Sequence, residues 1–204
     1  MHLFWSSRSP FVRKVMVVAH EAGLVQEIEL SRFAVGAAIL DKEVMATNPL
    51  NKIPTLIRDD GNALFGSQVI CEYLDGLRKP PTFFPQSFEQ RIEAQHWQAL
   101  GDGIMENATL TLGERRRTGP GFSENHVAAY RQKTAAALDY LELRMDAFEA
   151  MRFTIGAVAI GVALSHLDFR FSEENWRSGR PKIEKWHAQI ASRPSMLATE
   201  FVDR

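Results

Sequence analysis

Three prolines, at positions 80, 81 and 85, divide this 204-residue chain into two parts with different patterns of apolar residues. Proline cannot continue a helix, because it lacks the backbone N–H and its ring clashes with the preceding turn. Before the prolines, short apolar runs alternate with helical patterns, whereas after them only helical patterns occur. We therefore predict a domain over residues 1–78, a linker over 79–85 and a second domain over 86–204.

The first part has the pattern of alternating strands and helices. Short apolar or alternating runs indicate strands, and apolar residues spaced three or four apart indicate helices. The expected order is strand 1–5, helix 10–22, strand 26–30, helix 35–46, strands 53–58 and 63–65 around an AspGly turn, and helix 67–77. This is a βαβαββα domain.

The second part shows helical patterns only, which predicts an all-α helical bundle. The expected helices cover about 87–112, 123–148, 154–167 and 181–192. The whole chain is accordingly assigned to the α+β class.

Composition excludes several classes of function. The net charge is −1 and no basic cluster dominates either part, so we expect no nucleic-acid partner. A single cysteine, Cys71, and histidines without ligand spacing predict neither an intrachain disulfide nor a metal site. The N-terminus lacks an export signal, and the apolar run 155–164 has about half the length of a bilayer span. We expect a cytoplasmic protein without a membrane anchor.

Ser9 stands directly before Pro10 at a predicted turn between a strand and a helix. Proline favours the first helical position, so Ser9 is expected to cap the helix. A helix N-terminus favours negative charge and lowers the pKa of a thiol placed against it. A serine before a proline is more often only a cap, and this alternative stays open on the local pattern.

Pro54 lies inside a run that otherwise has the character of a strand. Strand prolines occur at edges, bulges or special turns. A cis bond would turn the backbone of Ile53 outward, where its N–H and C=O are able to pair with an extended ligand. An ordinary trans proline on an edge strand is the alternative, and the sequence does not decide between them.

Four segments together resemble the glutathione transferases, in particular bacterial members with a serine before the proline. They are SSRSPFVRKV at 6–15, NPLNKIPTL at 48–56, GSQVICEYLD at 66–75 and VALSHLDFRF at 162–171. The resemblance implies a thioredoxin-like fold for the first domain, glutathione as cosubstrate, a homodimer and a role in detoxification. Residues 6–9 contain no cysteine, which excludes disulfide exchange at this turn.

The resemblance also implies roles for particular residues. Ser9 corresponds to the catalytic serine beside the glutathione sulfur, and Ile53 and Pro54 to the backbone clamp on the cysteinyl part. Lys52 corresponds to a group near the glycyl carboxylate, and Ser67 to the group that binds the γ-glutamyl carboxylate. Gly66 replaces the usual acid that meets the ligand's ammonium, which weakens binding roughly ten- to a hundredfold. Gln68, or Asp102 from a partner subunit, is a candidate to compensate.

The function expected from this resemblance is conjugation of the glutathione thiolate to a small apolar electrophile held against the helical domain. Phe11 and Met105 are the candidate substrate-binding residues. Two alternatives remain: a noncatalytic binding or scaffolding dimer on the same fold, suggested by Gly66, and a glutathione-dependent isomerase or dehalogenase.

Overall fold

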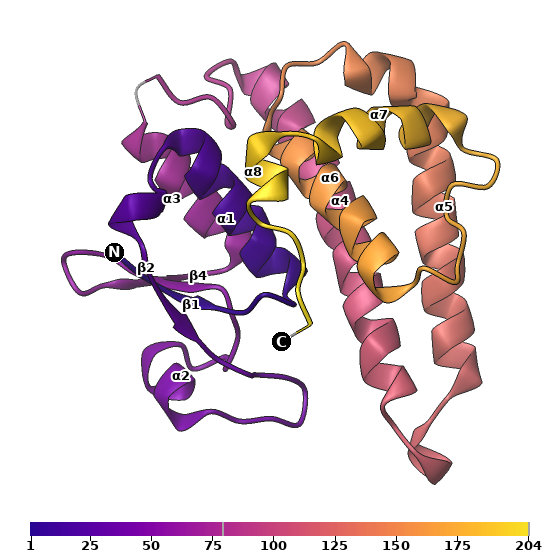
Figure 1. Cartoon of the computed structure of the whole chain (residues 1–204), viewed down its shortest axis with the longest axis horizontal. Coiled ribbons are helices and arrows are strands. Elements are labelled where there is room, and N and C mark those ends of the chain that lie inside the picture. Colours follow the sequence, from indigo (N-terminus) through magenta and orange to yellow (C-terminus); the bar gives the residue numbers. More distant parts are fainter. Residues whose placement is uncertain (79, 204) are drawn as a thin grey trace. The chain divides into compact units, whose positions relative to one another are not determined.

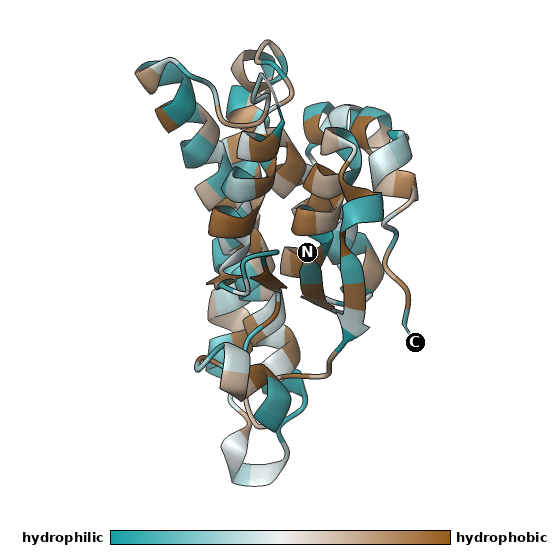
Figure 2. Cartoon of the chain, turned by 90° about the vertical axis from the view of Figure 1, so that its left-hand side faces the viewer, coloured by the Kyte–Doolittle hydropathy of each residue, from teal (hydrophilic) through white to brown (hydrophobic). Residues whose placement is uncertain are grey.

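The computed structural model describes residues 1–78 and 80–203. It forms two compact units, the first made of residues 1–94 and 194–204 and the second of residues 95–193. Most helices carry hydrophilic and hydrophobic residues side by side (Figure 2), as helices that bury only one face do. Among the described helices, none combines the length and the apolar character needed to cross a membrane.

The first unit is built on a four-stranded sheet in the order β2-β1-β3-β4. Strands β1 and β2 are parallel, and the pairs β1–β3 and β3–β4 are antiparallel. The elements are β1 His2–Trp5, α1 Pro10–Ala22, β2 Glu29–Arg32, α2 Lys42–Thr47, β3 Thr55–Ile57, β4 Ala63–Phe65 and α3 Ser67–Leu77. The predicted βαβαββα order is confirmed.

Helices α1 and α3 pack side by side on one face of this sheet, with α2 on its other side (Figure 1). The core between them contains Leu3, Leu56, Val15 and Ile70, which are all completely buried. Leu3 pairs with Leu56 across the antiparallel strands, so the central strands contribute adjacent apolar side chains to this core. The sheet and α1 thereby give a rigid base to the loops at their ends.

Several elements begin later than the sequence predicts. Strand β3 covers Thr55–Ile57, so the predicted strand over 53–58 is shorter at both ends. Strand β2 begins at Glu29, because Val25–Glu27 forms a short 3₁₀ turn. Helix α2 begins at Lys42, because the Asp41 carboxylate accepts hydrogen bonds from the backbone N–H groups of Glu43 and Val44 and caps it. The predicted helix over 35–46 is therefore wrong in its first half.

The second unit contains helices and no strand among its described residues. Its helices are α4 Phe88–Arg115, which starts in the first unit, α5 Glu124–Glu149, α6 Ile155–Arg170 and α7 Pro181–Ala191. Helix α6 is buried along most of its length, as its apolar sequence predicts. A further short helix, α8 Pro194–Leu197, belongs to the first unit.

The predicted linker over 79–85 starts at Lys79, which lies outside the described residues. The rest of this segment is fastened to the first unit. The buried carboxylate of Asp75 accepts hydrogen bonds from the backbone N–H groups of Thr82, Phe83 and Phe84 at 2.7–3.0 Å. Phe83 and Phe84 are themselves buried. The first unit thus extends past the predicted end at Arg78, and the division falls inside α4.

Candidate functional site

Ser9 is the N-cap of α1, and Pro10 occupies the first helical position, as predicted. The Ser9 hydroxyl oxygen accepts a hydrogen bond from the backbone N–H of Val12 at 3.3 Å. Its hydrogen can still be donated to another group, because accepting that bond uses only an oxygen lone pair. The first turn of α1 contains no acid. A negative charge at this end would therefore meet the helix dipole without a repelling carboxylate on the same turn.

The peptide bond between Ile53 and Pro54 is cis, which decides the alternative that the sequence left open. Pro54 immediately precedes β3. Within the described residues, neither the N–H nor the C=O of Ile53 makes a backbone hydrogen bond. Ile53 is also partly exposed. Its backbone therefore offers one donor and one acceptor to a ligand.

A buried asparagine holds the loop before Ile53 in place. Asn48 is completely buried, and its amide nitrogen donates to Lys52 O at 3.1 Å and to Thr55 Oγ1 at 2.9 Å. The Thr55 hydroxyl donates to the same Lys52 carbonyl at 2.8 Å. Asn48 and Thr55 were not predicted as site residues from the sequence. The available signal was a polar Asn inside NPLNKIPT, just before a strand that the core buries.

Ser67 is the first residue of α3, and Gly66 before it has a positive φ of 90°. Ser67 is nearly buried at 9% exposure, and in the described part of the chain its hydroxyl makes no side-chain hydrogen bond. The first turn of α3 contains no acid. The hydroxyl and the unpaired N–H groups at this helix end together form a site suited to a carboxylate.

One cavity of about 310 Å³ in the first unit brings most of these residues together. Its wall contains six of the eight predicted site residues. The lining residues are Phe11, Asn48, Leu50, Lys52, Ile53, Pro54, Phe65, Gly66 and Ser67. Within the described part of the chain, Lys52 is the only charged group on this wall, and no carboxylate lines it. The cavity therefore favours an anionic ligand that is extended along the Ile53 edge.

The two remaining predicted residues do not line this cavity. Ser9 lies two positions before Phe11, which does line it, on the turn that leads into the same helix. Met105 is on α4 in the second unit and is completely buried. Its burial is that of a core side chain, and its contact with a substrate stays a prediction.

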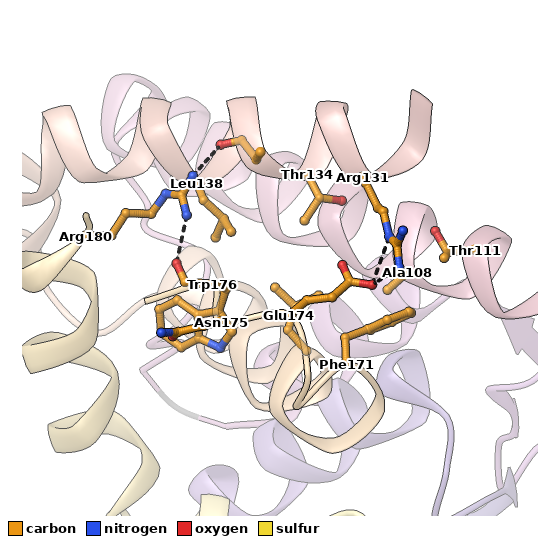
Figure 3. Close-up of a pocket in the computed structure, with 12 residues that line it drawn as sticks. Ala108, Thr111, Arg131, Thr134, Leu138, Phe171, Glu174, Asn175, Trp176 and Arg180 are labelled. Atoms are coloured by element: carbon orange, nitrogen blue, oxygen red, sulfur yellow. Dashed lines mark hydrogen bonds and ion pairs between the residues drawn. The ribbon is translucent and has the colours of Figure 1, made fainter. Parts of the chain in front are cut away.

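The second unit contains another cavity, of about 330 Å³, between α5 and the segment that follows α6. Its charged side chains already have partners (Figure 3). Arg131 binds Glu174 at 2.7 Å, and Arg180 donates to the carbonyl of Trp176 at 2.8 Å. Arg180 also pairs with Asp139 of α5. The Arg131–Glu174 and Arg180–Asp139 pairs tie α5 to the segment after α6. Because its charges serve this connection, the cavity of the first unit is the better candidate site.

Neither thiol chemistry by the protein itself nor a metal centre is indicated by the side chains that the structure describes. Cys71 is completely buried on α3, where a thiol is inert. Among the described residues, no group of three or more His, Cys, Asp or Glu side chains is arranged to hold a metal ion.

Comparison with known proteins agrees with this geometry. Residues 8–77 match the family model described as glutathione S-transferase, N-terminal domain, and residues 124–189 match the corresponding C-terminal domain. The GST-like protein YibF of Escherichia coli K12 is 30% identical over 202 residues, which are 98% of each chain. The chain belongs to the glutathione S-transferase family.

Solved structures of this family share the fold over nearly the whole chain. A family member from Pseudomonas fluorescens Pf-5, solved with bound glutathione, is 36% identical with a TM-score of 0.93, and the match covers 98% of both chains. A glutathione S-transferase from Methylobacillus flagellatus KT, solved with glutathione bound, is 31% identical with a TM-score of 0.86 and covers 98% of this chain and 99% of that one. The predicted thioredoxin-like domain followed by a helical domain is thereby confirmed.

Proposed function

We propose that this protein is a glutathione transferase and that the cavity of the first unit binds glutathione. The observation that carries the proposal is the gathering of Lys52, Ile53 and Ser67 on one cavity wall without a carboxylate beside them. Glutathione carries two carboxylates joined by an extended peptide, so it requires anion-binding groups on either side of a peptide-binding edge. The family members solved with bound glutathione support the same ligand.

The two carboxylates and the cysteinyl backbone of glutathione each have a suitable partner in the cavity. The ammonium of Lys52 would neutralise the glycyl carboxylate as a point charge. The free N–H and C=O of Ile53 would pair with the backbone of the cysteinyl residue, as in strand addition. The Ser67 hydroxyl and the N-terminus of α3 would bind the γ-glutamyl carboxylate. This pose directs the cysteinyl side chain toward the α1 end that carries Phe11 and Ser9.

Ser9 would act on the sulfur and would not be the nucleophile. The helix N-terminus and the Ser9 hydroxyl lower the pKa of the thiol, which loses its proton to solvent and becomes a thiolate. The thiolate sulfur then forms a bond to an electrophilic carbon of a small apolar substrate, and the leaving group departs with the bonding electron pair. Phe11 offers this substrate an apolar surface.

Gly66 leaves the ammonium of the γ-glutamyl group without an acidic partner on the cavity wall. A hydrogen bond between charged groups contributes about 1.5 to 3 kcal/mol, so we expect glutathione to bind roughly ten- to a hundredfold more weakly than with an acid at this position.

The test is a calorimetric titration with glutathione, followed by conjugation assays on wild type and Ser9→Ala. We expect wild type to bind glutathione and Ser9→Ala to lose conjugation rate about ten- to a hundredfold, because a hydrogen bond to the thiolate is removed. An unchanged rate in Ser9→Ala would exclude the role of Ser9.

The absence of an acid beside Ser67 favours one second candidate, a noncatalytic binding or scaffolding protein on the same fold. The same titration separates the two functions. Binding heat with millimolar glutathione supports the transferase, and no heat at that concentration supports the scaffold.

We also propose that the chain forms a homodimer. Phe65, Val69, Phe88 and Ile92, all in the first unit, are 39–71% exposed. Large apolar side chains that remain exposed are a feature of protein interfaces. Light scattering during size-exclusion chromatography should give the mass of two chains, and the mass of one chain would contradict the dimer.

A further inference from the structure

The turn over residues 6–9 carries Ser9, and its own hydrogen bonds fix it weakly. The backbone N–H of Ser9 donates to Ser6 O at 3.3 Å, which closes the turn. Ser7 and Arg8 are its two central residues. The Ser6 hydroxyl also accepts a hydrogen bond from the backbone N–H of Arg8 at 3.4 Å. A turn held by two such long bonds leaves its central residues able to change conformation unless other groups hold them.

Residues near the C-terminus hold both central residues of this turn. The backbone N–H of Val202 donates to Ser7 O at 3.3 Å, and the Ser7 hydroxyl donates to Val202 O at 2.8 Å. Arg8 forms an ion pair with Asp203 at 3.7 Å. The reciprocal Ser7–Val202 pair is the stronger contact, because the ion pair is exposed to solvent.

Arg13, in the first part of α1, contacts other residues near the C-terminus. Its guanidinium donates to Met196 O at 3.1 Å and lies 4.4 Å from the centre of the Phe201 ring. Burial lowers the pKa of Arg13 to about 10, and the nearby charge of Glu200 acts in the opposite direction. The backbone N–H of Arg13 donates to Ser9 O at 3.0 Å. The C-terminal residues therefore contact the Ser9 turn on one side and the helix that Ser9 caps on the other.

We propose that residues 201–203 form a C-terminal strap that positions Ser9, and that Ser7 is a positioning residue for the chemistry of the glutathione sulfur. This inference rests on the proposed role of Ser9. The strap fixes the turn relative to α1, so the Ser9 hydroxyl and the helix N-terminus act on the same point. Without the strap the turn relaxes, the two groups no longer converge, and the thiol ionises less readily.

Two variants test the strap. Ser7→Ala removes one bond of the reciprocal pair, and a chain ending at Glu200 removes the whole strap. The readout is the thiolate absorbance of bound glutathione as a function of pH, measured at saturating glutathione. We expect the pKa of the bound thiol to rise by about 0.5 to 1 unit in Ser7→Ala and further in the shortened chain, as loss of a neutral hydrogen bond requires. The affinity for glutathione should change little, because Lys52, Ile53 and Ser67 are untouched.

Ser192→Ala is the matched control. Its hydroxyl donates to Gln189 O on the exposed surface of the second unit, so the thiol pKa should equal that of wild type. Hydrogen exchange of the backbone amides over residues 6–13 provides a measurement that does not depend on glutathione. We expect faster exchange there in the shortened chain and in Ser7→Ala than in the control.

The outcomes separate the strap from the proposed function. If Ser9→Ala raises the thiol pKa but Ser7→Ala and the shortened chain titrate like wild type, the strap is excluded and the transferase stands. If wild type binds no glutathione, the transferase fails and the role of the strap in thiol chemistry fails with it. Unchanged hydrogen exchange over 6–13 excludes the strap in either case. Should the shortened chain not fold, Ser7→Ala decides alone.

Discussion

Gly66 adopts φ = 90° with open space where a Cβ atom would be. Glycine takes this conformation without strain, whereas a residue with a side chain incurs about 1 to 3 kcal/mol there. The neighbouring Ser67 then starts α3 in the position that faces the cavity. At position 66 the glycine avoids backbone strain, but it lacks the acidic side chain that would bind the glutathione ammonium.

Substitution of Gly66 separates these two effects. Gly66→Ala and Gly66→Asp should both lower the free energy of unfolding by about 1 to 3 kcal/mol, because both place a Cβ atom at a positive φ. Only Gly66→Asp adds a carboxylate beside Ser67, so it should bind glutathione about tenfold more tightly than Gly66→Ala. Urea unfolding and calorimetry check the two quantities. Equal affinities of the two variants would contradict the view that an acid at this position meets the ammonium.

At the scale of elements, the sequence predicted what periodicity and local caps determine. Helix α1 begins at Pro10, as the Ser9 cap indicates, and helix α3 begins at Ser67, as its apolar spacing indicates. The start of α2 was missed because the cap at Asp41 competes with a helical pattern that begins earlier. The asparagine network around Asn48 was missed because buried hydrogen bonds leave no periodic signal. The cavity residues were predicted from the family resemblance, whereas Asn48 and Thr55, whose hydrogen bonds hold the loop before Ile53, were not.

Helix α4 packs against α6 at one close approach, which Gly101 makes possible. A Cβ atom at Gly101 would lie 2.6 Å from the backbone carbon of Ala159, closer than atoms can approach without movement. Gly101→Ala should lower the free energy of unfolding by about 1 to 3 kcal/mol, since the two helices must separate. At Gly103, half a turn further along α4, such a Cβ would have no atom of the described residues within 4 Å. Gly103→Ala should stabilise the protein by about 0.5 to 1 kcal/mol. Thermal and urea unfolding check this pair, and destabilisation of equal size in both variants would indicate a general effect of glycine loss from the helix.

At the scale of the whole molecule, the chain returns to its first unit after the helical unit is complete. Residues 194–204 belong with residues 1–94, so the second unit is inserted between two parts of the first. Proline positions and periodicity could not predict this, because they describe local conformation and carry no information on which distant segment a helix contacts. Short helix α8 shows the consequence: it packs on α1, and Ser195 donates a hydrogen bond to the Glu21 carboxylate at 2.6 Å.

If α8 is a structural part of the first unit, its buried face should contribute to stability as a core residue does. Met196 is completely buried, whereas the next residue, Leu197, is 53% exposed. Met196→Ala should lower the free energy of unfolding by about 2 to 5 kcal/mol, as removal of a buried side chain does. Leu197→Ala should change it by less than about 0.5 kcal/mol. Urea unfolding followed by circular dichroism measures both.

Because Met196 O accepts a hydrogen bond from Arg13, loss of this packing should also speed amide exchange at the start of α1, next to Ser9. Equal free energies of unfolding of the two variants would mean that the packing of α8 does not contribute to the stability of the first unit.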